Sequence, residues 1–232
     1  MHRILPVLLG GLTASQAAAQ ELIEVDLELV LAVDISYSVD EDEARRQREG
    51  YVAALAHPDV ISAIEGGPLG RIAVTYVEWA VIASEADALD FAAMVAAAPL
   101  ERGHYTAIGA AIADSVRRIE TNQYQGYRRL IDISGDGPQN QGMDLGEARA
   151  MADEARIIIN GLPVITDRPG RWVRPVEVNL DVYFSDHVVT GPGAFVLPAR
   201  TADEFRTAIL RKMTLEIAGA APAAIELAQA AP

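Results

Sequence analysis

The feature that most restricts the fold is a set of apolar segments that each end abruptly in polar residues. Residues 25–34 (VDLELVLAVD) are rich in valine and leucine and have the length of one strand, which predicts a strand buried on both faces. Three later segments have a similar character, at 71–79, 128–134 and 156–162. Between and after them lie segments with the charge order, caps or stop signals of helices, at 40–67, 87–97, 106–119, 144–155, 179–189 and 201–217.

Strands that alternate with helices predict an α/β chain folded as a three-layer sandwich, with a Rossmann-like, mostly parallel sheet and helices on both faces. Right-handed crossovers bring the loops after such strands together at the carboxyl edge of the sheet. We therefore expect the polar residues that follow the strands, near positions 34, 134 and 162, to share one edge. Residues 81–82 and 194–197 are expected to add short strands.

The N-terminus has the order of a secretory signal peptide. A basic start at Arg3 is followed by the apolar run 4–12 and by an A-x-A arrangement at Ala17 and Ala19. The apolar run is too short to span a bilayer, so we expect cleavage after Ala19 and a periplasmic or secreted protein. Residues 20–218 then form one domain, and the low-complexity segment 219–232 is expected to be a disordered tail.

Charge and cysteine content exclude several classes of protein. The formal net charge is −14, which disfavours binding to nucleic acid or to anionic lipid through the overall field. The chain has no cysteine, so disulfides and thiolate metal sites are excluded. No segment after the N-terminal one predicts a membrane span.

Oxygen-bearing side chains from three separate segments are predicted to meet at the carboxyl edge. Asp34, Ser36 and Ser38 leave the first strand in an alternating pattern that lets all three reach one point. Thr106 stands at the predicted N-cap of a helix, and Asp136 follows another strand within SGDG. A set of carboxylates and hydroxyls without imidazole or thiolate favours Mg²⁺, Mn²⁺ or Ca²⁺ over zinc or copper.

The motifs DISYS, the Thr106 loop and SGDG resemble the metal-ion-dependent adhesion site of von Willebrand factor A and integrin inserted domains. GRIAVTYVEWA, RRLIDISGDGPQNQG, INGLPV and GPGAFV also resemble a bacterial von Willebrand A-like family of unassigned function, over nearly all of residues 25–218. This resemblance implies that Ser36, Ser38 and Thr106 bind the metal directly. It implies that Asp34 and Asp136 hold waters or bind directly.

Such a site would serve adhesion-type protein binding. Hydroxyl ligands neutralise little of the metal charge, so an open coordination position attracts a Glu or Asp carboxylate from a protein partner. Residues inside or near the metal loops are candidate partner contacts: Tyr37, His104, Tyr105, Arg171 and Trp172. For the basic loop at 166–175, an ordinary surface loop is an equally good interpretation.

Two other hypotheses for the function compete with adhesion-type protein binding. A metal-dependent hydrolase could use the same site, although Ser134 lacks a G-x-S-x-G motif and the single lysine, Lys212, lies far from the metal loops in sequence. A metal-free interaction scaffold is disfavoured because all five ligand positions carry suitable residues. Asp132, inside an apolar strand, is expected to form a structural pair with an arginine or a backbone network.

Overall fold

A computed structural model describes residues 21–34, 41–78, 88–98, 106–165 and 179–220. The four strands in these ranges are β1 (Ile23–Val33), β2 (Ile72–Val77), β3 (Tyr124–Gly135) and β4 (Ile158–Pro163). The helices are α1 (Glu41–Leu55), α2 (Pro58–Glu65), α3 (Ala88–Ala97), α4 (Ile108–Thr121), α5 (Leu145–Glu154), α6 (Leu180–Tyr183) and α7 (Ala202–Ala218). A π-helical turn, η1 (Phe184–Val188), continues α6.

The strands form one parallel sheet in the order β2-β1-β3-β4. β1 lies in the centre, with Leu29 opposite Val74 of β2 and Leu130 of β3. Its residues from Val25 to Val33 are buried, as expected for a strand covered on both faces. The predicted three-layer α/β fold is confirmed.

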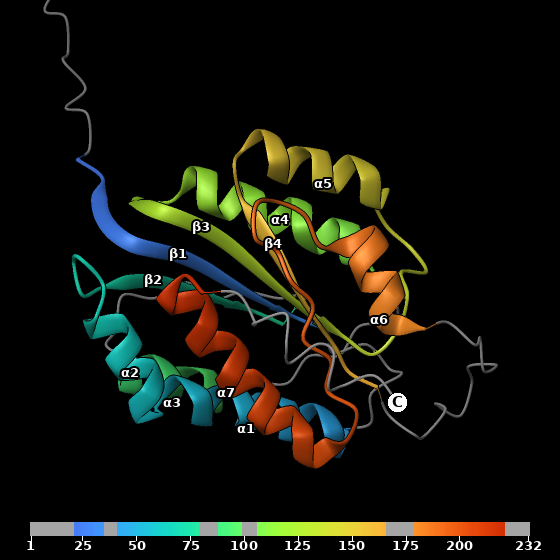
Figure 1. Cartoon of the computed structure of the whole chain (residues 1–232), viewed down its shortest axis with the longest axis horizontal. Helices are drawn as coiled ribbons and strands as arrows, with labels where there is room; N and C mark the ends of the chain where they lie inside the picture. The colour runs from blue at the N-terminus through green and yellow to red at the C-terminus, as the bar shows by residue number, and fades with distance from the viewer. Residues whose placement is uncertain (1–20, 35–40, 79–87, 99–105, 166–178, 221–232) are drawn as a thin grey trace, which may run out of the picture.

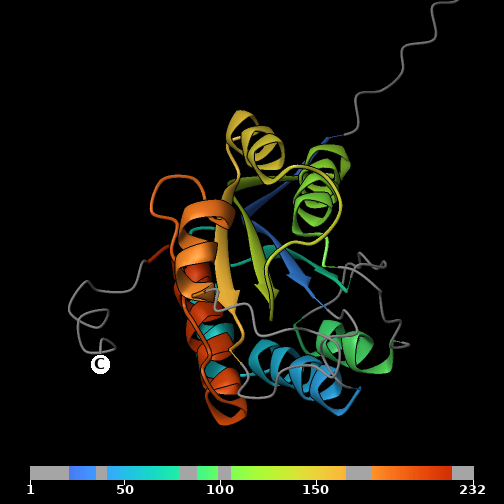
Figure 2. The same ribbon diagram turned by 90° about the vertical axis from the view of Figure 1, so that its right-hand side faces the viewer.

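Alternate residues of the strands build two cores. Leu27, Leu29 and Leu31 of β1 face the layer that holds α1, α2, α3 and α7. Val30 and Ala32 face the opposite layer, which holds α4, α5 and α6. Figure 1 shows these two groups of helices on either side of the sheet, and Figure 2 shows the same layers from the side.

Most of the expected elements are present. The helical segment at 40–67 is divided at Pro58, as its proline predicts, and 179–189 is a short α-helix, as expected, extended by a π turn. The strand expected at 194–197 is wrong: Val196 makes only an isolated bridge to Gly161. Positive φ angles at Gly191 and Gly193 turn the chain just before it. The expected strand at 81–82, the leader and residues 221–232 of the expected tail lie outside the described residues.

None of the described helices is long and apolar enough to cross a membrane.

Candidate functional site

Asp34 and Asp136 follow neighbouring, hydrogen-bonded strands at the carboxyl edge. The pairing of β1 with β3 continues one step past Val33, because the Asp34 N–H donates to the Ser134 carbonyl at 3.0 Å. Asp34 is buried, at 2% exposure, and Asp136 is half-buried. A Cβ added to Gly135 would lie 3.5 Å from Asp34 Oδ2, so the Asp34 carboxylate lies beside the end of β3. The structure thus brings the two carboxylate-bearing segments together.

Thr106 is attached to the loop that follows Asp136. Its N–H donates to Asn140 Oδ1 at 3.1 Å, and its carbonyl accepts the N–H of Asn140 at 3.0 Å. The residue is 4% exposed. The loop after β3 therefore carries Asp136 and also fixes the position of Thr106.

The expectation that Thr106 caps α4 is wrong. The helix begins at Ile108, its N-cap is Ala107, and that residue offers no side-chain cap. Thr106 stands one residue before this N-cap, where its backbone groups pair with the loop. Instead Gln139 Oε1 accepts the N–H of Gly109 at 2.6 Å, which satisfies one of the free donors of the first helical turn.

Gln139 and Asn140 are functional candidates that sequence reasoning missed. The Gln139 side chain also donates to the Met143 carbonyl at 2.8 Å, and the backbone N–H of Gln139 donates to the Tyr183 hydroxyl at 3.1 Å. The loop approaches α4 so closely that a Cβ on Gly109 would lie 2.2 Å from the Met143 carbonyl oxygen. The run PQNQG beside SGDG was the available signal, but nothing in it names α4 as the partner.

The chemistry of the described donors fits a hard divalent cation. Asp34, Thr106 and Asp136 supply carboxylate and hydroxyl oxygens on segments that contact one another. Within the described ranges, no three His, Asp or Glu side chains gather as a metal-ligating group, so a site here depends on hydroxyls as well. The other residues predicted at this edge, Ser36, Tyr37, Ser38, His104, Tyr105, Arg171 and Trp172, lie outside the described residues.

Glu78, at the end of β2, belongs to a buried ion pair. Arg48 of α1 donates to it through Nε at 2.7 Å and through Nη2, and the Tyr76 hydroxyl donates at 2.9 Å. Burial, followed by the charge of Glu78, raises the pKa of Tyr76 well above its usual value. The Arg48 guanidinium also donates to the Ala98 carbonyl, so the pair ties α1, β2 and the end of α3 together.

Asp132 also has an ionic partner, but it is a lysine rather than the expected arginine. Lys212 Nζ lies 2.6 Å from Asp132 Oδ1, and Lys212 is fully buried at 0% exposure. The only lysine of the chain is therefore used inside the fold, beneath α7.

A family model described as a protein of unknown function (DUF1194) matches residues 24–221. The chain belongs to this family. No curated protein matches it. The DUF1194 match covers the sheet, both helical layers and the carboxyl-edge loops described above.

Solved structures with the same fold are von Willebrand A-like domains. The pilus adhesin SpaC from Lactobacillus rhamnosus GG has a TM-score of 0.58 at 12% identity, over 83% of this chain and 31% of that one. Proximal thread matrix protein 1 from the mussel byssus, with a zinc-occupied MIDAS motif, has a TM-score of 0.57 at 11% identity, over 83% and 46%. The von Willebrand domain of the type V pili tip protein Mfa5 from Porphyromonas gingivalis has 0.55 at 11%, over 86% and 97%.

This DUF1194 chain spans less than half the length of SpaC and of the byssus protein, and nearly the whole of the Mfa5 domain. The identities are low, so these likenesses establish the von Willebrand A-like fold and leave the activity to be argued from the site.

Proposed function

We propose that this protein is an exported, divalent-metal-dependent protein-binding domain of the adhesion type. The ligands in this proposal are Asp34, Ser36, Ser38, Thr106 and Asp136, and the metal is Mg²⁺, Mn²⁺ or Ca²⁺. An open coordination position takes a Glu or Asp carboxylate from the partner. Residues Tyr37, His104, Tyr105, Arg171 and Trp172 are proposed to contact that partner.

One observation carries the proposal. Asp34 and Asp136 stand at the ends of two hydrogen-bonded parallel strands, and the loop after Asp136 holds Thr106. Two carboxylates on adjacent segments repel each other unless a proton or cation lies between them. A divalent cation offsets that repulsion, and a threonine hydroxyl beside them adds a neutral ligand that leaves the metal attractive to another anion.

The structural neighbours support this choice over an enzyme. Two come from pili, one of them named an adhesin, and one is described with a zinc-occupied MIDAS motif. That zinc makes it necessary to test Zn²⁺ beside the harder cations, although an oxygen-only site in this chain should prefer Mg²⁺ or Mn²⁺.

The central experiment measures the thermal stability of the purified protein with and without metal. A ligand that binds only the folded state raises stability by RT ln(1 + [L]/Kd), about 2.7 kcal/mol at about a hundredfold excess over Kd. We expect Mg²⁺ or Mn²⁺ to raise Tm and EDTA to reverse the rise. In Asp34→Ala and Asp136→Ala the rise should shrink sharply, because each variant removes a charged ligand.

Asp59→Ala is the matched control. Asp59 is an exposed carboxylate in the first turn of α2, and its loss should leave the metal-dependent rise in Tm unchanged. If calorimetry detects no divalent cation binding to the wild type, or if all three variants respond to metal equally, the proposed site is wrong.

Export is tested separately by the mass of the mature protein. The basic, apolar and small-residue order of residues 1–19 predicts cleavage after Ala19. The native protein should therefore begin at or within a residue or two of Gln20. Recovery of a cytoplasmic protein that still begins at Met1 would contradict the proposed location.

A further inference from the structure

A cluster of three ionisable side chains lies buried between α7 and the sheet. Asp132 of β3 is 2% exposed, Glu216 of α7 is 1% exposed, and Lys212 of α7 is 0% exposed. The Lys212 ammonium lies 2.6 Å from Asp132 Oδ1 and 2.5 Å from Glu216 Oε1. One cation thus serves two carboxylates.

Full ionisation would leave this cluster with an excess negative charge. Burial of such a charge in a low-dielectric interior is costly, and the usual outcome is that one group changes its protonation state. Asn160 of β4 faces Glu216 and donates to its Oε1 at 2.9 Å, but this amide is neutral. The Phe195 ring lies 5.8 Å from Lys212 Nζ and adds no formal charge.

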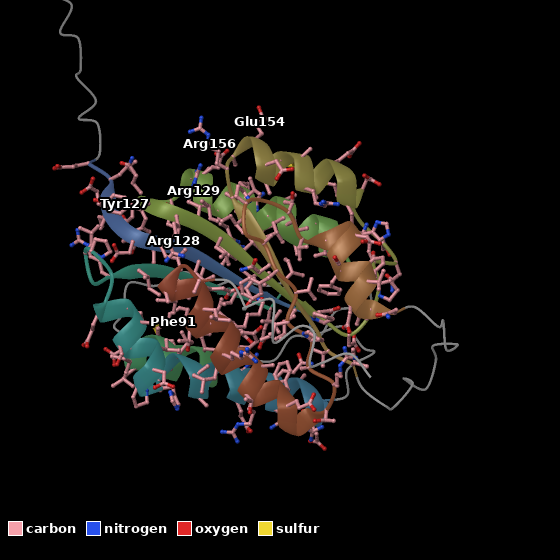
Figure 3. All side chains as sticks on the ribbon, in the orientation of Figure 1. Phe91, Tyr127, Arg128, Arg129, Glu154 and Arg156 are labelled. Carbon is pink, nitrogen blue, oxygen red and sulfur yellow. The ribbon has the colours of Figure 1, made fainter. Side chains whose placement is uncertain are left out.

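Two nearby arginines interact with other groups and do not neutralise the cluster. The Arg128 guanidinium, which lies towards the start of β3 in Figure 3, donates to the backbone carbonyls of Glu216 and Ile217 rather than to a carboxylate. Arg48 is paired with Glu78.

Among the described residues, Tyr51 of α1 is a further ionisable neighbour of the cluster, and it adds no positive charge. Burial and then the charge of Asp132 raise the pKa of its phenol well above the usual value, so the phenol stays neutral.

One oxygen of the cluster points to a proton. Glu216 Oε2 is buried and, among the described residues, has no hydrogen-bond partner, whereas Asp132 Oδ1 is in ionic contact with Lys212. An ionised carboxyl offers only acceptors, whereas a proton on Glu216 supplies a donor. Burial, then the charge of Asp132, raises the pKa of Glu216 to about 7, while Lys212 and Asn160 act in the opposite direction.

We propose that Asp132, Lys212 and Glu216 form a buried proton-binding site that holds α7 against the sheet and is occupied in mildly acidic conditions. The proton resides on Glu216 and leaves a balanced Asp132–Lys212 ion pair. When it dissociates, the cluster keeps a second carboxylate charge beneath the helix, and the docking of α7 weakens. The site shares no residue with the proposed metal site.

The test is the pH dependence of folding stability, measured by urea denaturation of the full chain in EDTA. The folded-state pKa of Glu216 is raised above its usual value of 4.5 to about 7. The stabilising contribution is therefore fully present below the usual value and is lost as pH rises through the folded value. Between the two, the folding equilibrium constant should fall by up to about tenfold per pH unit from this group.

Glu216→Gln should remove that contribution. The glutamine side chain has the shape of the protonated acid and cannot titrate, so the variant should match the wild type near about pH 5 and exceed it near about pH 8. Glu154→Gln is the control, because Glu154 is exposed on α5, as Figure 3 shows, and its loss should leave the pH profile unchanged. A wild-type profile identical to that of Glu216→Gln would overturn the proposal.

If the Glu216→Gln variant does not fold, a second measurement on the wild type still tests the proposal. The carboxyl carbon of Glu216 in the wild type, followed by NMR as a function of pH, should titrate near neutrality, and in Asp132→Asn it should titrate at lower pH because a neighbouring charge is gone. Titration of Glu216 at an ordinary carboxyl pKa would overturn the proposal. So would an intact mass lower by one water than the sequence requires, because an amide between Lys212 and Asp132 would remove the ionic cluster.

Discussion

Two amide side chains of one loop determine how α4 begins. The Gln139 side chain accepts the N–H of Gly109 in the first turn of the helix. The Asn140 side chain accepts the N–H of Thr106, which stands two residues before the helix. A helix whose own N-cap residue cannot accept a hydrogen bond needs acceptors from elsewhere. The geometry of the candidate site therefore depends on residues that are not among its proposed metal ligands.

Asn140→Ala should weaken both the fold and the metal site. The substitution leaves the buried Thr106 N–H without its acceptor, which costs about 1–2 kcal/mol of unfolding free energy. A freed Thr106 should also lower metal affinity several-fold. Urea denaturation and calorimetric titration with Mn²⁺ measure the two effects.

Gln141→Ala is the comparison for this prediction. Gln141 is exposed in the same loop, and its recorded bond to the Thr106 carbonyl uses the backbone N–H, which the variant retains. We expect near wild-type stability and metal affinity. Equal effects of the two substitutions would mean that Asn140 does not position Thr106.

At the scale of helices and strands, local signals predicted most of the fold. β1 was recognisable because one central strand buries both faces, and its apolar run is continuous. The helix α7 was recognisable from its ends: the Thr201 hydroxyl accepts the N–H of Glu204 at 3.1 Å, and Gly219 closes the helix with φ of 69°. Such signals lie within a few residues of the feature that they determine.

These local signals could not predict the contacts between segments that are distant in the sequence. The start of α4 depends on amides about thirty positions along the chain, and Asp132 pairs with a lysine eighty positions away. Residues 194–197 look like a regular strand in the sequence, yet after the turn at Gly191 and Gly193 only Val196 among them makes a bridge, and that bridge is isolated. At the candidate site, the sequence predicted that Asp34 and Asp136 share an edge, and it missed what fixes Thr106.

The whole molecule has a polarity that favours one binding edge. The four described strands run in the same direction, so the loops after β1, β3 and β4 lie at one end of the sheet. The chain as a whole carries a net charge of −14. Its overall field repels an acidic partner. Binding of a carboxylate at this edge would therefore need a local positive charge, which the proposed metal and the arginines of the 166–175 loop would supply.

This reasoning predicts metal-dependent binding of carboxylate peptides. Glu- or Asp-containing peptides should bind the immobilised protein in Mg²⁺ or Mn²⁺, and their Gln or Asn counterparts should not, because an amide is a weaker ligand for a hard cation. Chelation should abolish binding. Replacement of Arg171 and Trp172 by alanine should weaken peptide binding while the metal-dependent rise in Tm stays the same, since neither residue is a proposed ligand. Peptide binding that persists in EDTA would contradict the metal-mediated mode, and unaltered binding by the double variant would leave residues 166–175 an ordinary surface loop.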